Sequence, residues 1–333
     1  MENVKSKMTE TQGVIVWAID PFEKETKPDT VLVRRLMDWA NASGFELQPV
    51  HILSVPNSKS EIYFGAGSVY EETPAAQKAS EQYLRDLGVK GARPVEILVD
   101  YTSSGKGRVE KIVNFSKTVK APWIIISSHG RHGLGRIFLG SFAESLLLQS
   151  TIPVLFLTHL KTAEESEKPI SHVLFPTDFS DYSREAFLRF LDQAEKLNAE
   201  IIVFHSLSSL SIAASGFGAV PVVIPQNYFT DQAKWANEEG TRWTRLAHSH
   251  GISAKVIIKD EGLDDKHVGS SILKLARQEG TGLIAMASLS GAFTSFVLGS
   301  VARNVFRSNQ CPVWVYGPKA LEKRHTIEQT ASA

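Results

Sequence analysis

The chain has 333 residues, enough for two domains of ordinary size that each bury their own core. Its 36 basic and 36 acidic residues cancel, which argues against recognition of nucleic acid or an anionic membrane through an overall field. Residues 1–12 are polar, and no apolar run reaches the roughly 18 residues that a spanning helix needs. We therefore expect a cytoplasmic protein without a membrane span.

The first half of the chain alternates short apolar runs with stretches of helical periodicity. The runs predict strands at residues 14–19, 47–53, 95–99, 123–127 and 154–157. After the first run, Leu32, Leu36, Trp39 and Ala40 recur at helical spacing and predict a helix with one apolar face. Because the runs are apolar throughout and do not alternate, we expect a parallel sheet that helices cover on both faces.

The same alternation returns in the second half. Its apolar runs predict strands at residues 173–175, 201–205, 254–258, 283–287 and 313–316. Residues 163–169 contain three glutamates and no large apolar side chain, so they predict an exposed linker. The expected domains are therefore residues 1–162 and 170–318, followed by a polar tail at residues 319–333.

The two halves also repeat particular residues at nearly constant separation. The recurring anchors are Asp20 and Asp178, Leu139-Gly140-Ser141 and Leu298-Gly299-Ser300, and Ile152-Pro153-Val154 and Cys311-Pro312-Val313. A repeat unit of this length is a whole domain, far longer than the repeats of solenoids or propellers. The sequence therefore predicts a tandem duplication of one five-stranded α/β domain.

Two segments of the first half have the chemistry of a ligand site. Open parallel sheets bind ligands beyond the carboxyl ends of their strands, where the strand order reverses. Asp20 ends the first expected strand, and its carboxylate can accept hydrogen bonds from a nucleoside. The glycine-rich segment 127–141 follows the fourth strand, and the N–H groups of Gly140, Ser141 and Phe142 open a helix whose positive dipole end suits a phosphate.

This combination resembles the universal stress protein family. The family's motif after the fourth strand is Gly-x₂-Gly-x₉-Gly-Ser/Thr, and here Ser127, Gly130, Gly140 and Ser141 occupy it, so the first glycine is replaced. The resemblance covers both halves and implies a doubly wound, Rossmann-like domain with strand order 3-2-1-4-5 in each. It also implies that the fifth strands of the two halves pair within the chain and that two chains form a homodimer.

The resemblance further implies an adenine nucleotide, ATP or AMP with Mg, held mainly by the first half. Ala18, Ile19 and Asp20 would contact base and ribose, and the backbone of Ile52 would bond the adenine. The complete expected site comprises Ala18, Ile19, Asp20, Ile52, Ser127, His129, Gly130, Arg131, Gly140, Ser141 and Phe142. No general base or cationic clamp is evident, so we expect a regulatory protein with no hydrolysis of ATP or very slow hydrolysis.

The second half departs from the motif. The segment before Gly299 is one residue shorter than its counterpart and contains no cation. Only Pro176, Thr177, Asp178, Gly299 and Ser300 remain as a degenerate site, and the Gly299-Ser300 turn can serve the fold alone as a helix start.

A different class of function stays open beside nucleotide binding. Both halves carry a long connection after the second strand, which includes residues 62–67 and 215–225. The second connection is too apolar to be exposed to solvent. The apolar loops near Phe64 and Phe217 would then serve an interaction or sequestering module for a protein or a lipidic ligand. Such a module would bind no nucleotide.

Other polar residues receive structural interpretations. His51 and His205 recur at matching strand ends, which favours a role in the sheet. Cys311, the single cysteine, precedes an apolar strand and is expected to be a small buried residue. No Cys, Asp or Glu near His129 completes a metal site, and Ser127 and His129 do not form a nucleophile and base, because no Gly-x-Ser-x-Gly elbow is present.

Overall fold

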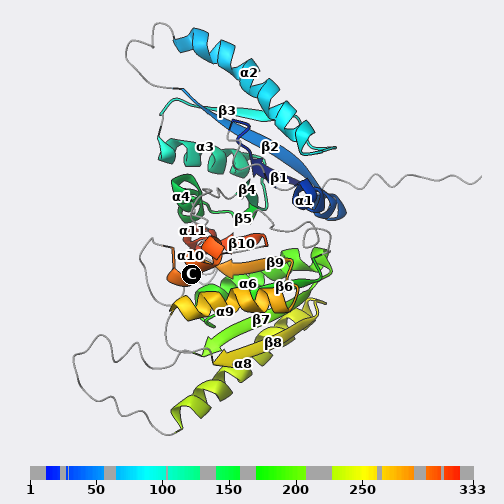
Figure 1. Ribbon diagram of the computed structural model, residues 1–333, viewed down its shortest axis with the longest axis vertical. Helices are drawn as coiled ribbons and strands as arrows, with labels where there is room; N and C mark the ends of the chain where they lie inside the picture. The colour runs from blue at the N-terminus through cyan, green and yellow to red at the C-terminus, as the bar shows by residue number, and fades with distance from the viewer. Residues whose placement is uncertain are drawn as a thin grey trace, which may run out of the picture.

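A computed structural model shows an elongated molecule with its two halves at opposite ends (Figure 1). The structure describes residues 13–22, 28, 30–55, 65–102, 104–127, 140–157, 170–207, 227–260, 265–288, 298–308 and 311–322. The linker 163–169 and the loop residues Phe64 and Phe217 lie outside these ranges.

Strands and helices alternate through both halves, as the apolar runs predict. The first half contains β1 (Gly13–Ala18), α1 (Thr30–Ala42), β2 (Phe45–Ser54), α2 (Gly65–Asp86), β3 (Glu96–Asp100), α3 (Gly105–Thr118), β4 (Ile124–Ser127), α4 (Ser141–Gln149) and β5 (Val154–Leu157). The second contains β6 (His172–Pro176), α6 (Asp181–Ala194) with the 3₁₀ turn η2 (Glu195–Leu197), β7 (Glu200–Leu207), α8 (Tyr228–Ser249), β8 (Ala254–Asp260), α9 (Asp265–Gln278), β9 (Leu283–Ala287), α10 (Ser300–Ser308), β10 (Val313–Tyr316) and α11 (Pro318–Leu321).

All the strands belong to one ten-stranded sheet with the order β3-β2-β1-β4-β5-β10-β9-β6-β7-β8. Neighbouring strands are parallel within each half, which confirms the doubly wound order 3-2-1-4-5. The fifth strands, β5 and β10, pair antiparallel with Trp314 opposite Leu155, as the resemblance implies. Each half therefore closes the sheet edge that its partner would otherwise leave open.

Two apolar layers, one on each face of the sheet, run without interruption through both halves. Successive residues of a strand point to opposite faces, so Val16 packs in one layer and Trp17 in the other. At the junction of the halves, Trp39 of α1 stacks on Trp123 at 4.4 Å between ring centroids, and Trp123 lies 4.9 Å from Trp314 of β10. The two domains consequently share their cores.

Two boundaries differ from the prediction. Residues 65–67, expected in a connection, are the first residues of α2, because the later turns of that helix pack against β2 and β3 and support its glycine-rich start. The polar tail begins later than residue 319, because Pro318 starts α11 and buries Ala320 and Leu321 against α4 and α6. No helix in the described part of the chain is long and apolar enough to cross a bilayer.

Candidate functional site

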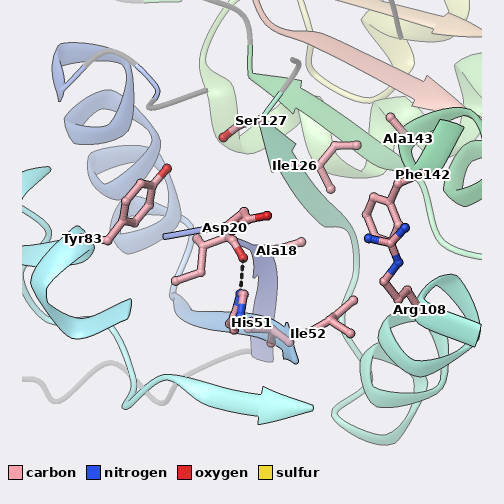
Figure 2. A pocket seen from close by; sticks show the side chains of 12 residues that line it. Ala18, Asp20, His51, Ile52, Tyr83, Arg108, Ile126, Ser127, Phe142 and Ala143 are labelled. Carbon is pink, nitrogen blue, oxygen red and sulfur yellow. Dashed lines mark hydrogen bonds between the residues drawn. The ribbon is translucent and has the colours of Figure 1, made fainter. Parts of the chain in front are cut away.

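A pocket opens where the order of the first five strands reverses. β1 lies between β2 and β4, and the helices that follow β1 and β4, α1 and α4, pack on opposite faces of the sheet. Such a reversal of strand order leaves a crevice at the carboxyl ends of the strands. The pocket encloses about 150 Å³, whereas one water molecule needs roughly 10–15 Å³ of such volume. It is lined by Ala18, Ile19, Asp20, Val50, His51, Ile52, Tyr83, Arg108, Ile126, Ser127, Phe142 and Ala143 (Figure 2).

The backbone of Ile52 faces the unpaired side of β2. The register between β1 and β2 ends at Ala18 and Val50, and the N–H of Ile19 donates to the carbonyl oxygen of Val50. Backbone groups two residues apart on a strand point the same way, so the N–H and C=O of Ile52 also point toward β1, beyond its last paired residue. This edge can hydrogen-bond a planar heterocycle.

Asp20 lies at the mouth of the pocket with an exposed side chain. Its Oδ1 accepts a 3.1 Å hydrogen bond from the N–H of Phe22, which holds the carboxylate in a local turn. A carboxylate oxygen has several lone-pair positions, so this bond leaves Asp20 able to accept from a ligand.

His51 joins the ends of two strands beside Asp20. Its Nδ1 lies 3.2 Å from the carbonyl oxygen of Ile19, and its ring meets Phe22 edge-on at 5.5 Å. In the second half, Nδ1 of His205 lies 2.8 Å from the carbonyl oxygen of Thr177. Since a carbonyl only accepts, Nδ1 of each ring carries the proton. Both histidines are therefore built into the sheet, as their matching positions suggested.

Tyr83 and Arg108 line the same pocket and were not among the predicted site residues. Tyr83 comes from α2, and burial, with a smaller effect from the negative charge of Asp20, raises the pKa of its hydroxyl. The hydroxyl therefore stays a neutral donor. Arg108 comes from the first turn of α3, and its guanidinium carbon lies 5.9 Å from the centroid of the Phe142 ring. The available signal for Arg108 was the basic run Gly105-Lys106-Gly107-Arg108, which follows the expected strand at residues 95–99.

The start of α4 forms the remaining wall. Gly140 is the N-cap of α4 and supplies no side-chain acceptor to the helix, so the first N–H groups stay available to a ligand. A Cβ on Gly140 would meet no atom of the described residues within 4 Å, and the φ of −63° is open to any residue. Neither packing nor backbone conformation therefore requires glycine at this position. The open space beside Gly140 is where a ligand could approach the backbone closely.

The structure brings together most of the residues predicted for the first-half site. Those lining the pocket are Ala18, Ile19, Asp20, Ile52, Ser127 and Phe142. Gly140 and Ser141 directly precede Phe142 at the start of α4. The predicted residues His129, Gly130 and Arg131 lie outside the described residues.

In the second half the matching residues serve the fold. Asp178 Oδ1 accepts hydrogen bonds from the N–H and hydroxyl of Ser180, at 3.0 and 2.6 Å, and from the hydroxyl of Ser183 at 2.7 Å. Ser180 is itself the N-cap of α6. The carboxylate therefore stabilises the positive end of that helix.

Aromatic side chains fill the space beside Asp178. Phe179 adopts a left-handed backbone conformation with φ 58°, and its ring lies 4.8 Å from His205 and 5.3 Å from Trp243 of α8. The remaining motif residues also take part in the fold. Pro176 ends β6, and the N–H of Thr177 just after it donates to Phe204 O. Gly299 N–H donates to Ser288 O at 3.2 Å, and Ser300 starts α10. Packing of this kind favours a structural role for the degenerate site.

Comparisons with known proteins agree with this architecture. The model of the universal stress protein family matches residues 13–157 and again residues 169–317. A universal stress protein from Archaeoglobus fulgidus shares the fold, with a TM-score of 0.61, 18% identity and coverage of 91% of this chain and 98% of its own. A protein from Pseudomonas aeruginosa described as functionally unknown has a TM-score of 0.55 at 15% identity, covering 97% of this chain and 98% of its own. No curated protein is significantly similar in sequence.

Proposed function

We propose that this chain, which belongs to the universal stress protein family through both of its halves, binds an adenine nucleotide in the pocket of the first half. The observation that carries the proposal is the meeting of Asp20, Ile52 and Phe142, from three different elements, around one pocket at the point where the strand order reverses. The family membership and this geometry rest on independent evidence.

One side of the pocket suits a nucleoside. The free backbone edge of Ile52 would pair with the adenine, while Ala18, Val50 and Ile126 supply apolar walls for its faces. The carboxylate of Asp20 would accept hydrogen bonds from ribose hydroxyls or from the amino group. Each of these groups can make its contact without giving up a hydrogen bond that the protein needs.

The start of α4 suits the phosphates. The N–H groups of Ser141, Phe142 and Ala143 lack a side-chain cap, and the helix dipole adds positive potential at the same end. Within the described residues, Asp20 is the carboxylate that lines the pocket, so a magnesium ion would be held mainly by the phosphates themselves.

We propose binding and regulation rather than catalysis. Among the described residues, the imidazole that lines the pocket is His51, which is engaged with the carbonyl oxygen of Ile19 through the nitrogen that carries its proton. His51 belongs to β2 and not to the start of α4. We expect hydrolysis of ATP to be absent or very slow. A cytoplasmic stress-response role and a homodimer stay predictions from the family.

Calorimetry of the full chain with Mg-ATP, AMP and adenosine tests the proposal. We expect one nucleotide per chain, because Asp178, the counterpart of Asp20 in the second half, is engaged by Ser180 and Ser183. Nucleotide released by acid from the freshly purified protein provides a second readout. Two nucleotides per chain would contradict the structural role of the degenerate site, and no binding of any of the three compounds would contradict the proposed function.

A further inference from the structure

The pocket carries opposite charges on opposite sides. Asp20 and Tyr83 lie together on one side, and Arg108 and Phe142 lie together on the other (Figure 2). A ligand that fills the pocket therefore meets a hydrogen-bond acceptor at one end and a cation at the other. Compounds that carry hydroxyl or amino donors at one end and an anion at the other end match this arrangement.

Arg108 has no anionic partner within the described residues. Its guanidinium carbon lies near the ring of Phe142, and a cation–π contact does not consume the N–H donors of an arginine. Lys106, two residues earlier on the same helix turn, instead lies 3.8 Å from Glu110 with a side chain that is 75% exposed. These two cations in the first turn of α3 thus differ, because Lys106 is exposed to solvent and Arg108 lines the pocket.

The start of α3 is already satisfied by its own chain. Ser104 Oγ accepts the N–H of Gly107 at 3.0 Å, and Thr102 donates its hydroxyl to Asp100 at 2.8 Å below the same turn. A Cβ on Gly107 would overlap Thr102 Oγ1, so this turn is closely packed. The closely packed first turn of α3 therefore fixes the position of Arg108 and is not itself a ligand site.

The guanidinium instead reaches the start of the neighbouring helix. Phe142, the residue it contacts, is the second residue of α4, whose first N–H groups have no side-chain cap. Positive potential from the helix dipole and the charge of Arg108 thus meet on one side of one pocket. A planar guanidinium binds two phosphate oxygens at once, which a single backbone N–H cannot do.

We infer that Arg108 is a phosphate-recognition residue that makes this pocket select nucleoside polyphosphates over nucleosides. The inference rests on the proposed function and adds to it a specificity determinant from α3, outside the glycine-rich segment. Asp20 and the edge of Ile52 would hold the nucleoside in either case, so a change at Arg108 should affect only the phosphorylated ligands.

Isothermal titration of the full chain with ATP and with adenosine tests this inference. We expect the wild type to prefer ATP, and Arg108→Gln to weaken ATP binding roughly tenfold or more with less than a twofold change for adenosine. Arg108→Lys, which keeps the charge but loses the two-pronged contact, should fall in between. Lys106→Gln removes the same charge from the same helix turn outside the pocket and should leave both affinities unchanged.

The other outcomes separate the two proposals. Three results would overturn the role of Arg108 but not the proposal that the pocket binds a nucleoside. They are equal wild-type affinities for ATP and adenosine, an equal loss of both affinities in Arg108→Gln, and an equal loss of ATP affinity in Lys106→Gln. A wild type that binds neither compound would overturn both proposals. Thermal unfolding of each variant without ligand confirms that the folded chain is being compared.

Discussion

The carboxylate of Asp178 accepts a 2.7 Å hydrogen bond from the hydroxyl of Ser183, which commits this aspartate to the first turn of α6. Asp20, at the matching strand end of the first half, accepts from the N–H of Phe22 and lines the pocket. One residue type at one position of a repeated domain therefore supports the fold in one half and lines a pocket in the other. The difference leads to opposite expectations for the two aspartates.

Asp178→Ala should destabilise the protein. It removes the acceptor for Ser180 and Ser183 and a negative charge from the start of α6, so we expect the free energy of unfolding to fall by about 1 to 3 kcal/mol. Urea denaturation followed by circular dichroism measures the change, and ATP affinity should stay at the wild-type value. An unchanged unfolding midpoint would show that the cap contributes nothing.

Asp20→Ala should act on binding instead. Its side chain is exposed and holds one local turn, so we expect little change in stability. Losing a hydrogen-bonded carboxylate from the ligand typically weakens affinity by roughly tenfold or more. Calorimetry with ATP checks this, with Asp178→Ala as the matched control. Equal affinities for the two variants would exclude Asp20 from the site.

Gly140→Val should abolish nucleotide binding without unfolding the protein. A Cβ at Gly140 meets no atom of the described residues within 4 Å, and the backbone conformation there is allowed, but the side chain enters the space where a phosphate would approach α4. Gly105→Val, at the start of α3, is the control because a Cβ there also meets nothing within 4 Å. Calorimetry and thermal unfolding should show lost binding at a nearly unchanged melting temperature. Wild-type affinity in Gly140→Val would rule out the phosphate role of α4.

Gly317→Ala should weaken the junction between the halves. A Cβ at Gly317, just after β10, would overlap the carbonyl oxygen of Leu147 on α4, so one of the two segments must shift. Overpacking of this kind costs about 1 to 3 kcal/mol. Denaturation followed by tryptophan fluorescence suits the test, since Trp39, Trp123 and Trp314 pack together at the same junction. Gly105→Ala serves as the neutral comparison, and an equal midpoint for both variants would contradict the close approach.

Acidification should destabilise the second half through His205. Burial lowers the pKa of this imidazole, and the bond to Thr177 and the charge of Asp178 oppose the shift only in part. Because the unfolded chain then takes up the proton first, this contribution to stability is complete above about pH 6.5 and is lost as the pH falls below it. His205→Asn should therefore lose less stability than the wild type between pH 7.5 and 5.5. Identical pH profiles in urea denaturation would contradict this role.

The sequence by itself determined the fold class and the place of the candidate site. Continuous apolar runs separated by helical periodicity specify strands buried on both faces, and hence a parallel sheet. This holds whatever the order of the strands in the sheet. Asp20 and Gly140 follow two such runs, and the carboxyl ends of parallel strands share one edge of the sheet. Local pattern was sufficient because each strand end is marked by the residues around it, and the parallel arrangement then brings these ends to one edge.

Only the tertiary structure decided which other side chains reach that edge. Tyr83 and Arg108 lie on helices remote in sequence from Asp20, and each enters the pocket because of how its helix is rotated against the sheet. The same dependence on packing turned Asp178 toward Ser183 and drew residues 318–321 into a helix over the junction. The rotation of a helix against the sheet depends on many long-range contacts together, so a short stretch of sequence cannot predict it.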